Sequence, residues 1–341
     1  MPTQRRPVTV ADIARRAGVS HQVVSAALRL LLGRPTGTVR VSTETAQRVQ
    51  ELALSLGYRP NAAALSMRSR RHRRIALLMS LLPGRSHLPE GFLEALHDGL
   101  ATAGLELALH RVDDRRLTDI DYVPGILRQW SCDALAINYS VAPPPRLAEL
   151  VSNNQVPAIW INRRLKADCV TFADRAGGGE AARRLIVSGH RRLAWFCLDG
   201  DLPSHLSGHD SQSERLAGFR QACVDAGVGV EIRSGGDFAW LKQPCRPTAV
   251  ACYSDLEACL LLGACLQLGL RLPTDLSVIA ISEWGPHVHL GLARIQVDGL
   301  GLGAATAAAL LRAVETGTLR QKPVEVAMEF IPGPTLGPPP S

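Results

Sequence analysis

The chain has 341 residues, 46% of them hydrophobic, which is more than one small domain requires. It has no run of 18 apolar residues, and no apolar segment follows Arg5 and Arg6, so neither a membrane span nor a secretory signal is predicted. Eight cysteines without a Cys-x-x-Cys pair indicate reduced thiols in a cytoplasmic protein rather than disulfides or a metal site.

Positive charge is concentrated at the start of the chain. Residues 1–74 contain 14 arginines, no lysine and three acidic residues, whereas the rest has 24 basic and 28 acidic residues. The formal charge of +7 therefore comes entirely from the first segment. This segregation indicates a polyanionic partner for residues 1–74, the alternative being a solvated basic surface.

The first elements predicted along the chain are two short helices. Thr9 can cap a helix over Val10–Ala17, and Asp12 follows three residues later as in a capping box. Gly18 supplies the positive φ of a tight turn, and Ser20 caps a second helix of about two turns. Two short helices joined by a glycine turn are typical of the helix-turn-helix that reads DNA in the major groove.

A third helix is predicted from its cap at Ser42 to about Leu56, and Gly57 ends it. An extended turn follows because Arg59 precedes a proline, and residues 61–68 can form one more short helix. Residues 68–74 are strongly basic. They are either a solvated tether or a source of additional phosphate contacts.

After residue 74, short apolar runs alternate with helical segments. Strands are predicted over 75–81, 105–110, 133–138, 156–161, 193–198, 248–253, 276–281 and 324–331. Helices are predicted over 90–103, within 116–130, and over 146–153, 177–188, 211–226, 255–268 and 299–315. This alternation indicates an α/β body of doubly wound parallel sheets with helices on both faces, behind a small all-α headpiece.

Five segments in this order resemble the LacI/GalR family of bacterial transcription regulators. They are Val8–Ser25, Val41–Asn61, Ser188–Arg192, Ser213–Phe219 and Leu272–Val278. The resemblance implies a helix-turn-helix domain over 1–60, a hinge helix and basic linker over 61–74, and an effector-binding and dimerisation domain over 75–341. It further implies two lobes like those of periplasmic binding proteins, with crossovers near 169–174, near 292–298 and near the C-terminus.

The resemblance implies that the partner is double-stranded operator DNA and that base contacts come from His21 and Gln22. Gln can bind adenine in a bidentate manner, and His can donate to guanine. Ala26 replaces a usual arginine, so a guanine contact is either missing or made by Arg29. Met67 takes the place of the apolar wedge that the hinge inserts into the minor groove. The full set of expected DNA contacts is Thr9, Ser20, His21, Gln22, Ser25, Arg29, Asn61, Ala64, Met67 and Arg70.

The resemblance also implies a small-molecule effector in the cleft between the lobes. Arg215 matches a ligand-gripping arginine and Phe238 a stacking aromatic, while Asp255 keeps a family carboxylate. The expected acceptors are replaced at three positions: Asn162, Ser254 and Ser282. A neutral cleft edge with one arginine favours an anionic or weakly polar ligand over a neutral sugar.

Two tryptophans at strand ends, Trp160 and Trp284, either line this pocket or pack in the core. Because fewer than a dozen residues separate Phe238 from Thr248, the usual helix there must be short or absent. No cofactor is expected. His205, His209 and Asp210 cluster in the sequence, but the surrounding proline and glycine indicate a loop rather than a metal-binding helix.

The sequence therefore predicts a transcriptional regulator, most simply a repressor, whose operator affinity an effector modulates. A solute-binding protein and an enzyme with an added DNA-binding head are the alternatives. The N-terminal module opposes the first, and the lack of a convergent acid/base set opposes the second. A homodimer is expected because paired heads match paired half-sites, with the helix over 90–103 as its candidate contact. No heptad repeat follows residue 333, so no tetramer through a C-terminal coiled coil is expected.

Base-reading and phosphate-binding residues should respond differently to substitution. Gln22→Ala should cost about 1–3 kcal/mol on the specific operator and relax specificity at one base pair. Arg70→Ala should instead weaken binding to all sequences and reduce its salt dependence. Competition between operator and scrambled DNA distinguishes the two effects. Equal losses on both DNAs in both variants would show that the second helix does not read bases.

Overall fold

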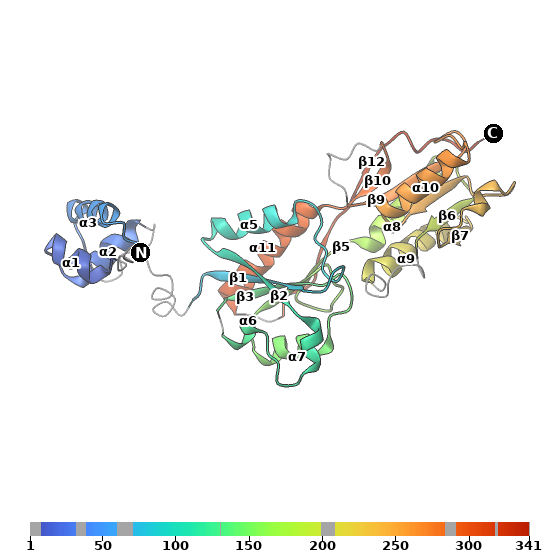
Figure 1. Cartoon of the computed structure of the whole chain (residues 1–341). Helices are drawn as coiled ribbons and strands as arrows, with labels where there is room; N and C mark the ends of the chain where they lie inside the picture. Colours follow the sequence, from blue (N-terminus) through green and yellow to red (C-terminus); the bar gives the residue numbers. More distant parts are fainter. Residues whose placement is uncertain are drawn as a thin grey trace, which may run out of the picture. The chain divides into compact units, whose positions relative to one another are not determined.

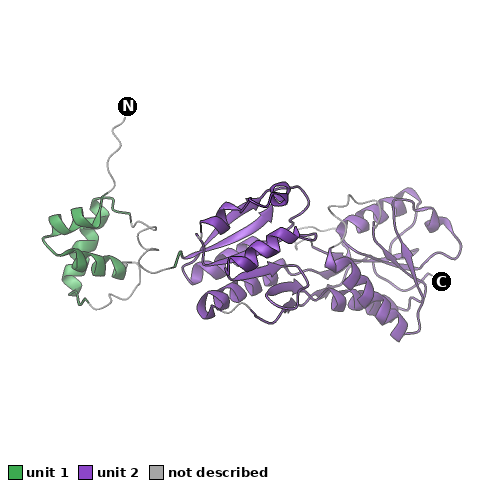
Figure 2. Cartoon of the chain, turned by 90° about the horizontal axis from the view of Figure 1, so that it is seen from below, with its two compact units in different colours: residues 1–72 green, residues 73–341 purple. Residues whose placement is uncertain are grey.

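The structure is a computed structural model that describes residues 8–31, 39–59, 71–129, 131–198, 209–283, 291–317 and 320–340. Its chain divides into two compact units, residues 1–72 and residues 73–341 (Figure 2). The predicted helix over 61–68 lies outside the described residues, as do five of the expected site residues: Asn61, Ala64, Met67, Arg70 and Trp284.

The described part of the first unit is a headpiece of three helices (Figure 1). Its helices are α1 (Val10–Ala17), α2 (His21–Leu31) and α3 (Thr43–Ser55). The capping box is present, since Thr9 and Asp12 satisfy each other's backbone N–H groups, and Gly18 ends α1 at a φ of 66°. Ile13, Val24 and Val49 are fully buried where the three helices meet.

The second helix is longer than predicted. It has 11 residues rather than two turns. Its buried positions continue past the predicted end through Ala27 and Leu28, and alanine, leucine and arginine are good helix formers.

The second unit contains two six-stranded sheets, which define lobe 1 and lobe 2. The order in lobe 1 is β11-β5-β4-β3-β1-β2, and every pairing is parallel. Its strands are β1 (Arg74–Ser80), β2 (Glu106–Val112), β3 (Ala134–Asn138), β4 (Ala158–Ile161), β5 (Cys169–Phe172) and β11 (Val324–Val326).

Lobe 2 repeats this arrangement with the order β12-β10-β9-β8-β6-β7, in which only β12 is antiparallel. Its strands are β6 (Leu193–Phe196), β7 (Val230–Arg233), β8 (Ala249–Cys252), β9 (Ser277–Ser282), β10 (Ala293–Gln296) and β12 (Glu329–Ile331). Most of these strands read as continuous apolar runs because helices cover both faces of a parallel sheet.

Helices cover both faces of each sheet (Figure 1). In lobe 1 they are α5 (Phe92–Thr102) and α11 (Gly299–Thr316) on one face, with α6 (Gly125–Arg128) and α7 (Pro145–Asn153) on the other. In lobe 2 they are α8 (Asp174–Val187) and α9 (Asp210–Asp225) on one face, with α10 (Asp255–Gln267) on the other. The described chain also contains two short 3-10 helices, η1 (Asp114–Thr118) and η2 (Ala239–Lys242). The short η2 agrees with the predicted lack of a full helix after Phe238.

The chain passes between the lobes three times at the predicted places. β5 is followed by α8, β10 is followed by α11, and β11 is followed by β12. The single strand predicted over 324–331 was wrong, because β11 belongs to lobe 1 and β12 to lobe 2. The strands β5, β7 and β10 were not predicted. Each has only four residues, and β7 is a half-exposed edge strand without an apolar run.

The helices α8 and α9 cross at glycine contacts. A Cβ atom on Gly178 would lie 1.9 Å from the carbonyl oxygen of Arg215, and one on Gly218 would lie 1.8 Å from that of Arg175. Neither helix backbone could keep its position with a larger residue there. Gly178 and Gly218 are therefore needed for packing, and together they set the distance between the two helices.

Two neighbouring glycines should respond oppositely to alanine. Gly178→Ala should lower the free energy of unfolding by about 1–3 kcal/mol or more, because overpacking forces the helices apart. At Gly179 an added Cβ would meet first the mobile guanidinium of Arg183, at 3.2 Å. Gly179→Ala should therefore be neutral or gain up to about 1 kcal/mol from helix propensity. Urea unfolding of the two variants tests this, and equal effects would contradict it.

Candidate functional site

The headpiece presents the start of α2 to solvent. His21 and Gln22 are both exposed at the first two positions of the helix. Ser20 Oγ accepts a hydrogen bond from the backbone N–H of Val23 at 3.3 Å, which fixes the direction in which the helix begins. The two predicted base-reading side chains are therefore free of the core and project from a capped helix.

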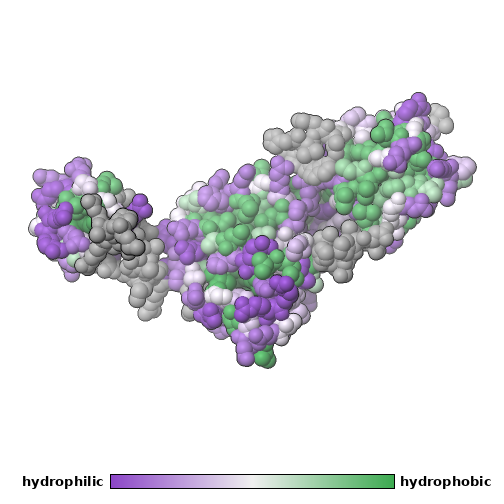
Figure 3. Space-filling model, viewed as in Figure 1, coloured by the Kyte–Doolittle hydropathy of each residue, from purple (hydrophilic) through white to green (hydrophobic). Residues whose placement is uncertain are grey.

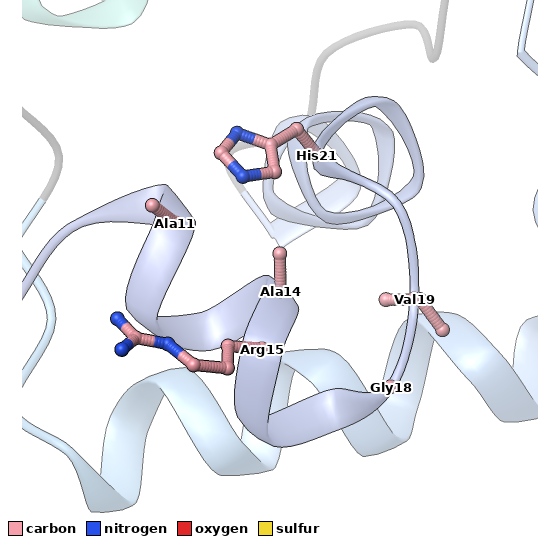
Figure 4. Close-up of a pocket in the computed structure, with 6 residues that line it drawn as sticks. All are labelled: Ala11, Ala14, Arg15, Gly18, Val19 and His21. Atoms are coloured by element: carbon pink, nitrogen blue, oxygen red, sulfur yellow. The ribbon is translucent and has the colours of Figure 1, made fainter.

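An open groove runs beside this helix start. Figure 4 shows the His21 ring above the small side chains of Ala11 and Ala14, with Arg15 extending from α1 nearby. Thr9, a predicted DNA contact, lies at the cap of the same α1 helix and donates its hydroxyl to Asp12 at 2.7 Å. The groove is therefore lined by the guanidinium of Arg15, the imidazole of His21 and the methyl groups of two alanines.

The rest of the predicted headpiece set lies further along α2. Ser25 and Arg29 are half-buried, whereas Ala26 is 2% exposed. Ala26, which stands where the family usually has an arginine, is therefore buried in the headpiece.

Arg215 lies on α9 and is 2% exposed. Its Nε donates to Asp174 Oδ1 at 2.7 Å, and Nη1 donates to the carbonyl oxygen of Tyr253 at 3.1 Å. A second carboxylate, that of Glu283, lies 4.0 Å from Nη2. The predicted neutral edge with one arginine was wrong, because the carboxylates of Asp174 and Glu283 lie beside Arg215.

A chain of hydrogen bonds leads from Tyr253, which contacts Arg215, to the backbone of Asn162 in lobe 1. His209 Nε2 lies 2.9 Å from the backbone oxygen of Asn162, and its Nδ1 lies 2.6 Å from Ser211 Oγ, which in turn is 2.8 Å from the hydroxyl of Tyr253. Burial lowers the pKa of His209 and raises that of Tyr253 to about 12. Both groups are therefore neutral at pH 7, and the imidazole donates to Asn162.

The other predicted effector residues have partners within their own lobes. Ser254 caps α10 by accepting from the N–H of Leu256 at 3.2 Å, and it also donates to Glu257. Phe238 packs edge-on against Phe196, with ring centroids 5.4 Å apart. The ring is only partly buried beside the core of lobe 2, so its role as a stacking aromatic stays a prediction.

The last three predicted effector residues occupy strand and helix ends. Asp255 accepts from the N–H of Glu283 at 2.8 Å, and Ser282 is 2% exposed at the end of β9. Trp160 on β4 packs against the core between the sheet of lobe 1 and α7, which favours the packing alternative.

Three residues near these strand ends were not predicted. Asn138 ends β3 and is 1% exposed, yet neither atom of its amide has a hydrogen-bond partner among the described residues. The other two are His87 of lobe 1 and Glu283 of lobe 2, whose Nε2 and Oε2 atoms lie 2.9 Å apart. A polar residue at the end of an apolar strand was the available signal for Asn138, and no sequence signal existed for the pairing of His87 with Glu283.

The described part of the chain shows neither a metal-binding cluster of His, Cys, Asp and Glu side chains nor a helix long and apolar enough to cross a membrane. Its cysteines are all free thiols, and most of them are buried.

Family models match both units. Residues 9–61 match the model of bacterial regulatory proteins of the lacI family. Residues 92–237 match the periplasmic binding proteins and sugar binding domain of the LacI family, and residues 182–336 match a periplasmic binding protein-like domain.

Relatives and solved structures agree with these matches. The transcriptional repressor PurR of Escherichia coli O139:H28 is 31% identical over 287 residues, covering 80% of this chain and 79% of PurR. The transcriptional regulator DegA of Bacillus subtilis is 27% identical over 292 residues, covering 81% of each chain. A structure of the lac repressor dimer bound to operator and the anti-inducer ONPF has a TM-score of 0.74 at 20% identity, covering 97% of this chain and 99% of that one.

A complex of the transcriptional regulator CelR with cellobiose has a TM-score of 0.63 at 23% identity, covering 97% of this chain and all of that one. The fold and the PurR match define a two-lobed regulator with a helix-turn-helix headpiece. The chain belongs to the lacI family of bacterial regulatory proteins. The named relatives are transcriptional regulators and repressors rather than enzymes.

The buried pair Arg215–Asp174 should dominate the stability of lobe 2. Arg215→Met leaves a buried carboxylate without its partner and should cost about 3–5 kcal/mol of unfolding free energy. The double variant Arg215→Met/Asp174→Leu should recover most of that loss, because no isolated charge is left buried. Urea unfolding of the single and double variants measures this. A single variant as stable as the wild type would show that the pair contributes no stability.

Proposed function

We propose that the protein is a repressor that binds a two-fold operator through paired headpieces and changes its operator affinity when a small effector binds between the lobes. The observation that carries the proposal is the exposure of His21 and Gln22 at the capped start of α2. A side chain that is held in place yet unburied at this position can form base contacts in the major groove. The arginine-rich composition of residues 1–74 supplies the attraction to phosphates.

The proposed effector site lies where side chains from the two lobes meet, around His87, Asn138, Asn162, Arg215 and Glu283. The buried amide of Asn138 supports a ligand there, because a buried polar group normally has a partner. Asn162 Oδ1 is likewise buried without a partner among the described residues. A ligand that satisfies both amides gains hydrogen bonds that the free protein lacks. We propose binding without chemical conversion, in a protein that acts in the cytoplasm.

Two exposed apolar surfaces, on α10 and α5, can form the contact of the proposed homodimer. Figure 3 shows apolar side chains gathered over α10, where Leu256, Leu260 and Leu266 are 52%, 40% and 83% exposed. Gly263 lies among them with open space where a side chain would be. On α5, the predicted contact helix, Leu93 is 48% exposed. A helix that is apolar on nearly every side is normally covered, which supports α10 as a second contact between protomers.

One pair of variants tests both the dimer and its role in operator binding. Leu260→Asp should weaken self-association at least about tenfold, which corresponds to about 1.4 kcal/mol, because it places a charge in an apolar contact. Operator affinity should fall with it, since a single headpiece contacts one half-site only. Analytical ultracentrifugation and operator titration by fluorescence anisotropy measure the two effects.

Val187→Asp is the matched control, because Val187 is 84% exposed at the end of α8, away from both surfaces. It should change neither measurement. A monomer that binds operator as tightly as the wild type would overturn the proposed mode of DNA binding.

A further inference from the structure

His87 makes a side-chain contact from lobe 1 to lobe 2. It lies between β1 and α5, in a segment held in place by hydrogen bonds to the end of the sheet. Its backbone N–H donates to Ser140 Oγ at 2.7 Å, and the neighbouring Ser86 donates to the carbonyl oxygen of Asn138 at 2.7 Å. The imidazole is therefore presented from a fixed base, with its Nε2 atom 2.9 Å from Glu283 Oε2.

Glu283 is fixed equally well on the side of lobe 2. Its backbone N–H donates to Asp255 at 2.8 Å, and its other carboxylate oxygen lies 4.0 Å from Arg215 Nη2. Arg215 already holds Asp174 at 2.7 Å. Two carboxylates thus share one buried guanidinium, so one negative charge remains for a second cation, and His87 is placed where that cation would sit.

The charge states of the facing groups agree with this assignment. The hydrogen bond that His87 donates to Glu283 raises the pKa of His87. Burial acts to raise the pKa of Glu283, but His87, Arg215 and His209 lower it, and the net direction is down. His209 itself has a lowered pKa because it is buried. Of the two histidines, His87 therefore supplies the positive charge opposite Glu283.

We propose that the carboxylate of Glu283 is a cation subsite between the lobes, occupied by the His87 side chain in the free protein, and that the effector carries an organic cation that takes its place. An ammonium, amidinium or imidazolium group fits this chemistry. This inference rests on the proposed function only in placing the effector between the lobes. It reverses the anionic ligand expected from the sequence.

Charge balance excludes the anionic alternative at this subsite. An anion would have to approach Arg215 past Asp174 and Glu283, and both carboxylates would repel it. A cation instead replaces His87 without leaving a carboxylate unpaired. The exchange also breaks the side-chain contact between His87 and Glu283 of lobe 2, so the ligand can change how the lobes are held together.

Chemical rescue tests the subsite without any knowledge of the natural effector. His87→Ala removes the internal cation and leaves Glu283 in place. Imidazole at pH 6, where it is largely protonated, should then bind the variant saturably and raise its Tm. The wild type, in which His87 competes for the subsite, should show a smaller rise at the same imidazole concentration. The double variant His87→Ala/Glu283→Gln should show no saturable rise. Sodium acetate is the anionic probe and should have no saturable effect on any of the three.

The control is His97→Ala. The side chain of His97 is 65% exposed, against 66% for that of His87, and its hydrogen-bond partner is Asp98 of the same helix in lobe 1. Imidazole should raise the Tm of this variant no more than that of the wild type. A saturable response of His87→Ala to acetate instead of imidazole would overturn the cation subsite, as would the absence of any response to imidazole.

A second measurement is the pH dependence of the charge on His87. His87 has a raised pKa, so its contact with Glu283 is fully charged below about pH 6.5 and is lost as the pH rises through the raised value. The His87 pKa, measured by NMR, should fall in Glu283→Gln. An unchanged His87 pKa would contradict the contact. Neither experiment uses DNA, so a failure here is distinguishable from a failure to bind operator.

Discussion

The buried ion pair between Arg215 and Asp174 is the interaction on which the arrangement of lobe 2 depends. It joins α9 to the first turn of α8, directly beside the glycine contacts at which the two helices cross. Breaking such a pair leaves a charge in a low-dielectric interior, which costs about 3–5 kcal/mol. Because Asp174 also begins the lobe 2 segment after β5, the pair fixes where the chain enters lobe 2.

The same pair determines what the inter-lobe region can bind. Arg215 pairs closely with Asp174, at 2.7 Å, whereas Glu283 lies 4.0 Å from Arg215. The nearer partner of Glu283 is His87 of lobe 1, at 2.9 Å. In the proposed site, the charge that a ligand would meet is therefore set by Glu283 and not by Arg215. A buried arginine that the sequence indicates as a ligand-binding group can instead be paired with acidic side chains of the same protein, as Arg215 is with Asp174 and Glu283.

The headpiece obeys a different constraint, since it is too small to fix its helices through a large core. Local caps supply the precision instead. The capping box of Thr9 with Asp12, the turn at Gly18 and the cap at Ser20 fix the short helices with respect to the chain direction. A helix start that is fixed in this way can keep His21 and Gln22 exposed without losing their orientation, which suits the base contacts proposed for them.

Local patterns in the sequence were sufficient for the headpiece and for the class of the body. Caps, turns and apolar periodicity act over a few residues, so α1, α3 and the alternation of strands and helices could be predicted. The strands β5, β7 and β10 could not, because polar residues interrupt each of these four-residue segments. The tertiary structure alone decided the partners of buried charges. Asp174 and Arg215 are 41 residues apart in the sequence, and His87 and Glu283 are 196 apart. No local rule records such distances, because charge pairing depends on which groups the fold removes from water together.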